Sequence, residues 1–288
     1  MGDRSETAWI LLRVVAIAAG FTSLMPLYAI GDTHAGGIKP TPRIVNGVPT
    51  ADFAEVGLVG PGCTGTLIGC QTVLTAAHCV EGNGTEPADP AGYTVFFQHA
   101  GTFAVNAIAI SPSWVRGVVV PGVGGQPGPG DLAVLRLVAP VSGIVPARLA
   151  SIRPPFDTAT TIVGFGLTGA ASHDFGIKRT GTGRTVDCGQ TAFSDSICSE
   201  PNPAIACSGD SGGPLFVGAG DDRRITGVLS GGTTDCQIGN IHVDVASHAA
   251  WILDVGGSDV RQAGNSVCGG LAPIGTAGTG PVVAEVLP

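Results

Sequence analysis

The segment Cys207-Ser208-Gly209-Asp210-Ser211-Gly212-Gly213-Pro214 constrains the fold and chemistry of this chain more than any other. Ser211 lies between small residues, which leave its hydroxyl group and the neighbouring backbone N–H groups open to an approaching molecule. An acidic residue precedes the serine, and a cysteine stands four positions before it. A glycine-rich segment of this kind is usually an ordinary loop, so its meaning depends on what accompanies it.

Two further segments supply the residue types that would make Ser211 reactive. Thr75-Ala76-Ala77-His78-Cys79 carries a histidine beside a cysteine, and Asp131 opens an apolar run. His78, Asp131 and Ser211 therefore occur in that order, 53 and then 80 residues apart. A serine hydroxyl is a weak nucleophile at neutral pH and needs an adjacent general base, a role that histidine fills most often. The three residues together predict nucleophilic catalysis.

These segments closely resemble the chymotrypsin/trypsin family of serine endopeptidases, from about residue 44 to 255. The resemblance implies that Ser211 is the nucleophile, His78 the general base and Asp131 the residue that orients the imidazole. It implies an oxyanion hole formed by the N–H groups of Gly209 and Ser211. The implied fold is all-β: two six-stranded antiparallel β-barrels and a C-terminal helix, with the catalytic cleft between the barrels.

Two alternatives belong to other classes. Residues 209–213 also fit the nucleophile elbow of α/β-hydrolases, for which Asp244 and His248 could complete a triad. That fold needs alternating strands and helices, whereas this chain has short β-type runs divided by its 46 Gly and 21 Pro. A non-catalytic binding module would normally lack a triad member, and none is missing.

Local patterns give a coarse organisation. Strands are expected within 67–76, 94–110, 131–137, 161–166, 224–230 and 241–245. The apolar spacing of 246–255 indicates the terminal helix. We expect barrels at about 44–145 and 146–245, and a Gly/Ala/Pro-rich tail over 256–288.

The N-terminal region predicts export and activation. Residues 1–35 combine early charges with a long apolar run, as in a signal peptide; an uncleaved membrane anchor is the alternative. Residues 36–43 are expected to form an activation propeptide. The resemblance implies a cut after Arg43 by a trypsin-like protease, after which the new ammonium group of Ile44 pairs with Asp210. The family's members made this way are secreted zymogens.

The resemblance also indicates which residues bind substrate. Ile205 would lie at the floor of the specificity pocket, where an apolar residue favours apolar side chains before the scissile bond. Ser230-Gly231-Gly232 would pair with the substrate backbone, and Ser230 would also reach Asp131. The far wall is either Asn240 or, with a one-residue gap, Gly239, so the depth of the pocket stays open.

Eight cysteines in an exported chain favour four disulfide bridges. The resemblance supplies Cys63–Cys79, Cys188–Cys198 and Cys207–Cys236. Cys70 and Cys268 remain, either bridged to each other or as two free thiols.

Charge and histidine spacing bear on partners and cofactors. A net charge of −8 with no Lys/Arg-rich patch argues against nucleic acid. His99, His173, His242 and His248 lack metal-like spacing, so no metal or other cofactor is expected. Polypeptides are the expected substrates, and the expected protein is a secreted monomer.

Overall fold

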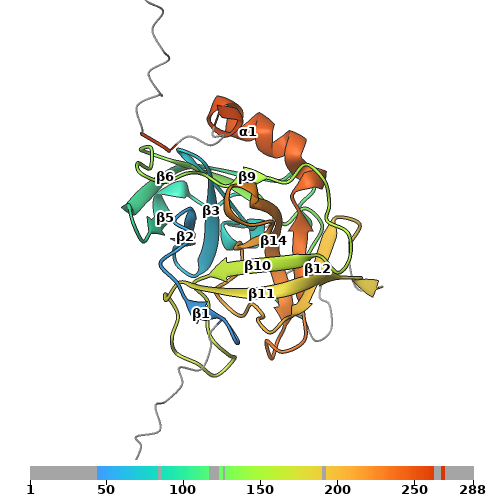
Figure 1. Ribbon diagram of the computed structural model, residues 1–288. Coiled ribbons are helices and arrows are strands. Elements are labelled where there is room, and N and C mark those ends of the chain that lie inside the picture. Colours follow the sequence, from blue (N-terminus) through green and yellow to red (C-terminus); the bar gives the residue numbers. More distant parts are fainter. Residues whose placement is uncertain are drawn as a thin grey trace, which may run out of the picture. The chain divides into compact units, whose positions relative to one another are not determined.

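The computed structural model describes residues 44–83, 86–116, 123–125, 127–189, 193–262 and 267–269 (Figure 1). The predicted signal peptide (1–35) and propeptide (36–43, including Arg43) lie outside these residues. Among the described residues, no helix is long and apolar enough to cross a membrane. The fold is the predicted one, with two six-stranded antiparallel β-barrels and a C-terminal helix.

The first barrel closes in the strand order β2-β3-β4-β8-β6-β5. Its strands are β2 Val56–Val59, β3 Cys63–Gly69, β4 Thr72–Thr75, β5 Thr94–Phe97, β6 Gly101–Ile110 and β8 Ala133–Leu137. In β5 exposed and buried residues alternate, as the two-residue period of a half-buried strand requires. The strand β4 is buried along its whole length, and the short helix η1 (Ala77–Cys79) follows it and carries His78. A second short helix, η2 (Pro90–Gly92), precedes β5.

The second barrel is a ring of six paired strands, β10-β11-β12-β15-β14-β13. Their bounds are β10 Ala159–Gly164, β11 Arg179–Val186, β12 Ser196–Pro201, β13 Pro214–Val217, β14 Arg224–Thr233 and β15 Asn240–Asp244. The turn between β13 and β14 contains the short helix η4 (Gly220–Asp222). Two short strands add to β14: β9 (Arg148–Leu149) in parallel and β7 (Val123–Gly125) in antiparallel orientation.

The first residues of the described chain belong to the second barrel, which differs from the boundary expected from the sequence. The strand β1 (Val48–Pro49) pairs with β11, and Val45 forms a bridge with Ile205. The expected first barrel therefore loses residues 44–49 to its neighbour. This pairing carries Ile44 into the interior of the second barrel, where its side chain is only 1% exposed.

The terminal helix also differs from expectation. The short helix η5 (Ala246–His248) leads into α1 (Ala249–Gln262), which continues beyond the expected end at 255 and is kinked at Gly257. Asp259, after the kink, accepts hydrogen bonds from the backbone N–H groups of Cys70 (3.0 Å) and Gln71 (2.9 Å). These bonds tie the second half of the helix to the β3–β4 turn, so residues 256–262 belong to the folded unit rather than to a tail.

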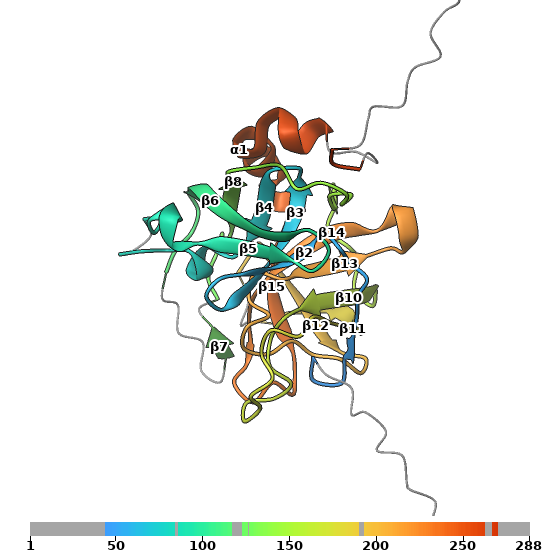
Figure 2. The same ribbon diagram turned by 90° about the vertical axis from the view of Figure 1, so that its left-hand side faces the viewer.

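One apolar cluster joins both barrels and the helix. It contains Leu74 and Leu132 from the first barrel, Phe216 and Val228 from the second, and Ile252 from α1, all 1% exposed or less. Fully burying a side chain of this size contributes about 1.5–3 kcal/mol to folding. In Figure 2, α1 lies over the β3–β4–β8 side of the first barrel. The shared cluster holds the two barrels together at the cleft.

The four predicted disulfide bridges are confirmed. Cys63–Cys79, Cys70–Cys268, Cys188–Cys198 and Cys207–Cys236 are all joined, so the alternative of two free thiols is wrong.

Candidate active site

His78 and Asp131 form a buried hydrogen-bonded pair at the edge of the first barrel. His78 Nδ1 lies 2.7 Å from Asp131 Oδ2, and the backbone N–H of His78 donates to Asp131 Oδ1 at 2.9 Å. Ser230 Oγ donates to the same Asp131 Oδ2 at 2.5 Å, the contact expected from the sequence. Asp131 is fully buried, so its carboxylate has these donors in place of water. An ionised carboxylate only accepts, which places the imidazole proton on Nδ1 and leaves a lone pair on Nε2.

The environment of His78 favours its protonated form. Burial acts to lower the pKa of His78, but the charge of Asp131 and its hydrogen bond outweigh burial and raise the pKa above its ordinary value. The imidazole is therefore a stronger base than a free histidine.

The Ser211 segment of the second barrel packs directly on the His78 segment of the first. The backbone N–H of Thr64 donates to the carbonyl of Ser211 at 2.8 Å. Thr64 follows Cys63, whose disulfide ends at Cys79 beside His78. Gly212 has a positive φ of 79°, and a Cβ there would lie 2.1 Å from Thr75 Oγ1, so only glycine fits. Thr64, which links the two barrels, could not be identified from any sequence pattern.

The N–H groups of Gly209 and Ser211 are available as donors. Among the described residues, no acceptor receives a hydrogen bond from either group. Gly209 has φ 95°, and a Cβ there would meet the Phe175 ring at 2.6 Å. Thr64 Oγ1 holds the carbonyl of Gly209 at 3.0 Å. Both N–H groups belong to residues that line one cavity, so an oxygen atom in that cavity could accept from them.

Asp210 lies beneath this segment and is buried together with Ile44. Its carboxylate accepts from the backbone N–H of Gly166 at 2.7 Å and of Cys207 at 2.9 Å. Burial raises the pKa of Asp210 to about 6, against the opposing effect of these donors and of the Arg179 charge. Ile44 and Asp210 line the same small internal cavity. Ile44 has φ 31°, a strained conformation for a β-branched residue.

A cavity of about 270 Å³ opens beside Ser211. Its lining includes Ala206, Ser211, Leu229, Gly231, Gly232 and Asn240, and no carboxylate among the described residues. The predicted floor residue, Ile205, does not line it; its side chain is 1% exposed and buried in the interior of the second barrel. Ile205 pairs with Val45, whereas Asn240, expected at the far wall, is one of the lining residues.

Two hydrogen bonds to the backbone of Ala206 hold the Asn240 side chain in the wall of this cavity. Its Oδ1 accepts from the N–H of Ala206 at 3.0 Å, and its Nδ2 donates to the carbonyl of Ala206 at 3.3 Å. A Cβ on Gly232 would lie 2.5 Å from Asn240 Nδ2, so the amide also fills the space beside Gly232. Of the two candidates for the far wall, Asn240 lines the cavity and Gly239 does not.

The strand edge expected to receive substrate is already paired. Gly231, Gly232 and Thr233 of β14 pair in antiparallel register with Gly125, Gly124 and Val123 of β7. Sequence patterns gave no sign of this, since a glycine-rich stretch of three residues has no β-type alternation. A substrate strand would therefore meet β7 on that edge.

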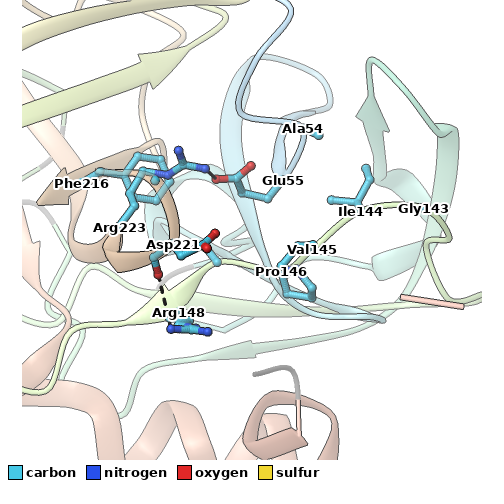
Figure 3. A pocket seen from close by; sticks show the side chains of 12 residues that line it. Ala54, Glu55, Gly143, Ile144, Val145, Pro146, Arg148, Phe216, Asp221 and Arg223 are labelled. Atoms are coloured by element: carbon cyan, nitrogen blue, oxygen red, sulfur yellow. Dashed lines mark hydrogen bonds and ion pairs between the residues drawn. The ribbon is translucent and has the colours of Figure 1, made fainter. Parts of the chain in front are cut away.

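Another cavity, of about 430 Å³, contains none of the three candidate catalytic residues (Figure 3). Three of its charged lining residues are engaged within the fold: Arg223 pairs with Glu55, and Arg148 donates to the carbonyl of Asp221. In the described part of the chain, one cluster has metal-ligand chemistry, Cys63, His78 and Cys79, but its two sulfur atoms are bonded to each other. Neither this cavity nor the cysteine–histidine cluster is therefore a better candidate for the active site than the cavity beside Ser211.

A histidine bonded to a buried aspartate, on a segment that packs against the one carrying a serine, agrees with the arrangement of a serine hydrolase. Comparison with known proteins agrees. Residues 44–252 match the family model described as trypsin. Trypsin delta of Drosophila erecta is 26% identical over 251 residues, which cover 78% of this chain and 94% of that protein. Trypsin of Saccharopolyspora erythraea is 32% identical over 186 residues, which cover 59% of this chain and 75% of that protein.

A solved structure shows the same fold. Neuropsin, a serine protease expressed in the limbic system of mouse brain, aligns with a TM-score of 0.59 and 20% identity over 71% of this chain and 95% of that chain. Because the family model spans most of its length, this chain belongs to the trypsin family of serine peptidases.

Proposed function

We propose that this serine peptidase cleaves polypeptides internally through an acyl-enzyme formed on Ser211. Ser211 Oγ adds to the scissile carbonyl carbon while His78 Nε2 takes the hydroxyl proton. The same proton passes to the leaving amine as the C–N bond breaks. Water, deprotonated by His78, then attacks the Ser211 ester, and His78 returns the proton to Ser211 Oγ as the acyl–oxygen bond breaks. The observation that carries this proposal is the fully buried Asp131 carboxylate bonded to His78 Nδ1, which keeps Nε2 as the base.

Charge that develops on the substrate needs donors that are already in place. In the proposed mechanism the tetrahedral oxyanion binds the N–H groups of Gly209 and Ser211. Loss of one such donor typically costs about 3 kcal/mol of transition-state stabilisation. Their fixed backbone positions, set by Thr64 and by the positive φ of Gly209, support this role.

We further propose a preference for apolar side chains before the scissile bond. An arginine or lysine side chain in the Ser211 cavity would be desolvated without a carboxylate partner, which costs several kcal/mol. An apolar side chain that buries roughly 100 Å² gains about 2.5 kcal/mol. We expect the Asn240 side chain, which is among the lining residues, to limit the size of that group, so Ala, Val and Leu should fit better than Phe or Tyr.

Activation is proposed to follow a cut between Arg43 and Ile44. The positive φ of Ile44 exists only while residue 43 is attached, so the cut removes that strain. The new ammonium group would lie near the Asp210 carboxylate, and a buried ammonium needs such a partner. The proposed preference against arginine means that a separate trypsin-like protease makes the cut.

The proposed setting is extracellular, with the protein secreted as a monomeric zymogen. Four disulfide bridges favour an oxidising compartment.

The test is covalent labelling of the trypsin-treated chain with a fluorophosphonate probe. Label should appear on Ser211, and Ser211→Ala should lose both label and peptidase activity. His78→Ala should abolish turnover. Turnover that survives His78→Ala, or label on another serine, contradicts the proposal.

A further inference from the structure

Asp195 connects three segments directly behind the catalytic aspartate. It lies between the bridged Cys188 and Cys198, and its Oδ2 accepts from the backbone N–H of Gly130 at 2.7 Å. The same oxygen lies 2.8 Å from His248 Nε2. The side chains of Asp195 and His248 are both 13% exposed, so water competes little for these bonds. Gly130 is the residue before Asp131.

Gly130 cannot be fixed by a side chain of its own. It has φ 66°, and a Cβ would lie 2.3 Å from Ser113 Oγ and 2.6 Å from the Ser113 carbonyl carbon. Glycine is therefore required on both steric and conformational grounds. The carbonyl of Gly130 accepts from Leu132 N–H at 2.6 Å, so Asp195 supplies the complementary contact on its N–H side.

The charge state of Asp195 suits this contact. Burial acts to raise the pKa of Asp195, but hydrogen bonds from His248 and Gly130 outweigh it and hold the pKa below its usual range. The charge of the carboxylate strengthens its bond to the Gly130 N–H. Nearby charges are engaged elsewhere: Arg153 pairs with Asp244 at 3.0 Å, and Ser247 Oγ donates to that same carboxylate. His248 therefore pairs with Asp195, not with the Asp244 of the α/β-hydrolase alternative.

We propose that Asp195, held by His248, is a positioning residue for catalysis. The hydrogen-bond donors to the Asp131 carboxylate orient its side chain, whereas Asp195 fixes the Pro129–Gly130 peptide, one residue before Asp131. Without Asp195, that peptide can rotate and shift the backbone that leads into Asp131. The Asp131–His78 bond then loses its alignment, and proton transfer slows. Small displacements of this kind can cost about a hundredfold in rate. The inference rests on the proposed roles of Asp131 and His78.

The experiment compares Asp195→Ala, Asp195→Asn and His248→Gln in the trypsin-treated full chain, with Asp187→Ala as the matched control. Asp187 is an exposed carboxylate on the same loop that contacts Gly189 rather than Gly130. Asp195→Ala should lower kcat by at least about tenfold. KM should stay within about twofold, because Asp195 does not line the Ser211 cavity. Asp195→Asn, which keeps an acceptor for Gly130, should recover most of kcat, and both His248→Gln and Asp187→Ala should stay close to the wild type.

A second readout needs no turnover. The His78 Nδ1 proton, bonded to Asp131, gives a low-field proton NMR signal that should weaken or shift in Asp195→Ala and persist in Asp195→Asn. An inactive wild type with the expected change in this signal would count against the proposed peptidase mechanism but support the positioning role. Unchanged kcat per folded molecule, or an unchanged signal in folded Asp195→Ala, would overturn the inference.

Discussion

Asn240 is one of the residues that line the cavity beside Ser211. The sequence indicated an apolar pocket because the position six residues before Ser211 is isoleucine. In the structure the described lining of the cavity also has no carboxylate, but Asn240 lines it and Ile205 does not. The side-chain amide of Asn240 bonds the backbone N–H and the backbone carbonyl of Ala206. No local pattern could show this, because it depends on a contact between residues 34 positions apart.

Asn240→Gly should enlarge the cavity. We expect the ratio of kcat/KM for peptides with Phe before the cut to those with Ala to rise by at least about tenfold, since extra pocket volume admits the larger side chain. Gln237→Gly is the control, because Gln237 is an exposed amide on the same segment and does not line the cavity. Chromogenic peptides that differ in this one residue provide the measurement. An unchanged ratio would show that Asn240 does not limit the pocket.

Among secondary-structure elements, the strands with strong apolar patterns were the predictable ones. The run 67–76 is a hairpin of β3 and β4 rather than one strand, because the chain turns at Cys70 and Gln71. The sequence predicted that the helix ends at 255, and not at Gln262, because the pair Gly256-Gly257 is typical of a helix C-terminus. There the contact from Asp259 to the β3–β4 turn outweighs local preference. The pairing of β1 with β11 joins residues far apart in sequence, which no local pattern reports.

The strand β7 should compete with substrate for the edge of β14. Only one partner can use the backbone groups of Gly231–Thr233 on that side. Deletion of residues 123–125 should therefore raise kcat/KM for extended peptides by about tenfold or more, mainly through a lower KM. A single-residue ester does not reach that edge and should be hydrolysed at an unchanged rate, which makes it the control. A lower kcat/KM for the extended peptide would instead make β7 part of the substrate cleft.

At the scale of the whole molecule, the candidate active site depends on contacts between residues that are far apart in the sequence. The family resemblance carried by the histidine, aspartate and serine segments was sufficient to predict the two-barrel fold. The Cys70–Cys268 bridge, with a sequence separation of 198, was one of two alternatives left after the resemblance had paired the other six cysteines. The Asp195 contact to Gly130 could not be predicted, because a single aspartate in a loop carries no signal of its partner.

Activation should change how the stability of the folded unit depends on pH. In the uncut chain the pKa of Asp210 is raised from 3.8 to about 6, so the folded state retains a proton that the unfolded state releases. Its contribution to stability is fully present below pH 3.8 and is lost as the pH rises through 6. The loss amounts to about 3 kcal/mol. After the cut, the Ile44 ammonium group should stabilise the ionised carboxylate and remove this loss.

Urea unfolding between pH 4 and 7 measures the effect, with Ser211→Ala as the background to prevent self-digestion. The pKa of His242 is lowered by burial to about 4, so His242 contributes stability that is present above pH 6.5 and is lost as the pH falls towards 4. That dependence is common to both forms and cancels in their difference. The cut form should gain stability over the uncut form as the pH rises from 4 to 7, and Asp210→Asn should abolish the gain. Parallel pH profiles for the two forms would contradict an Ile44–Asp210 ion pair.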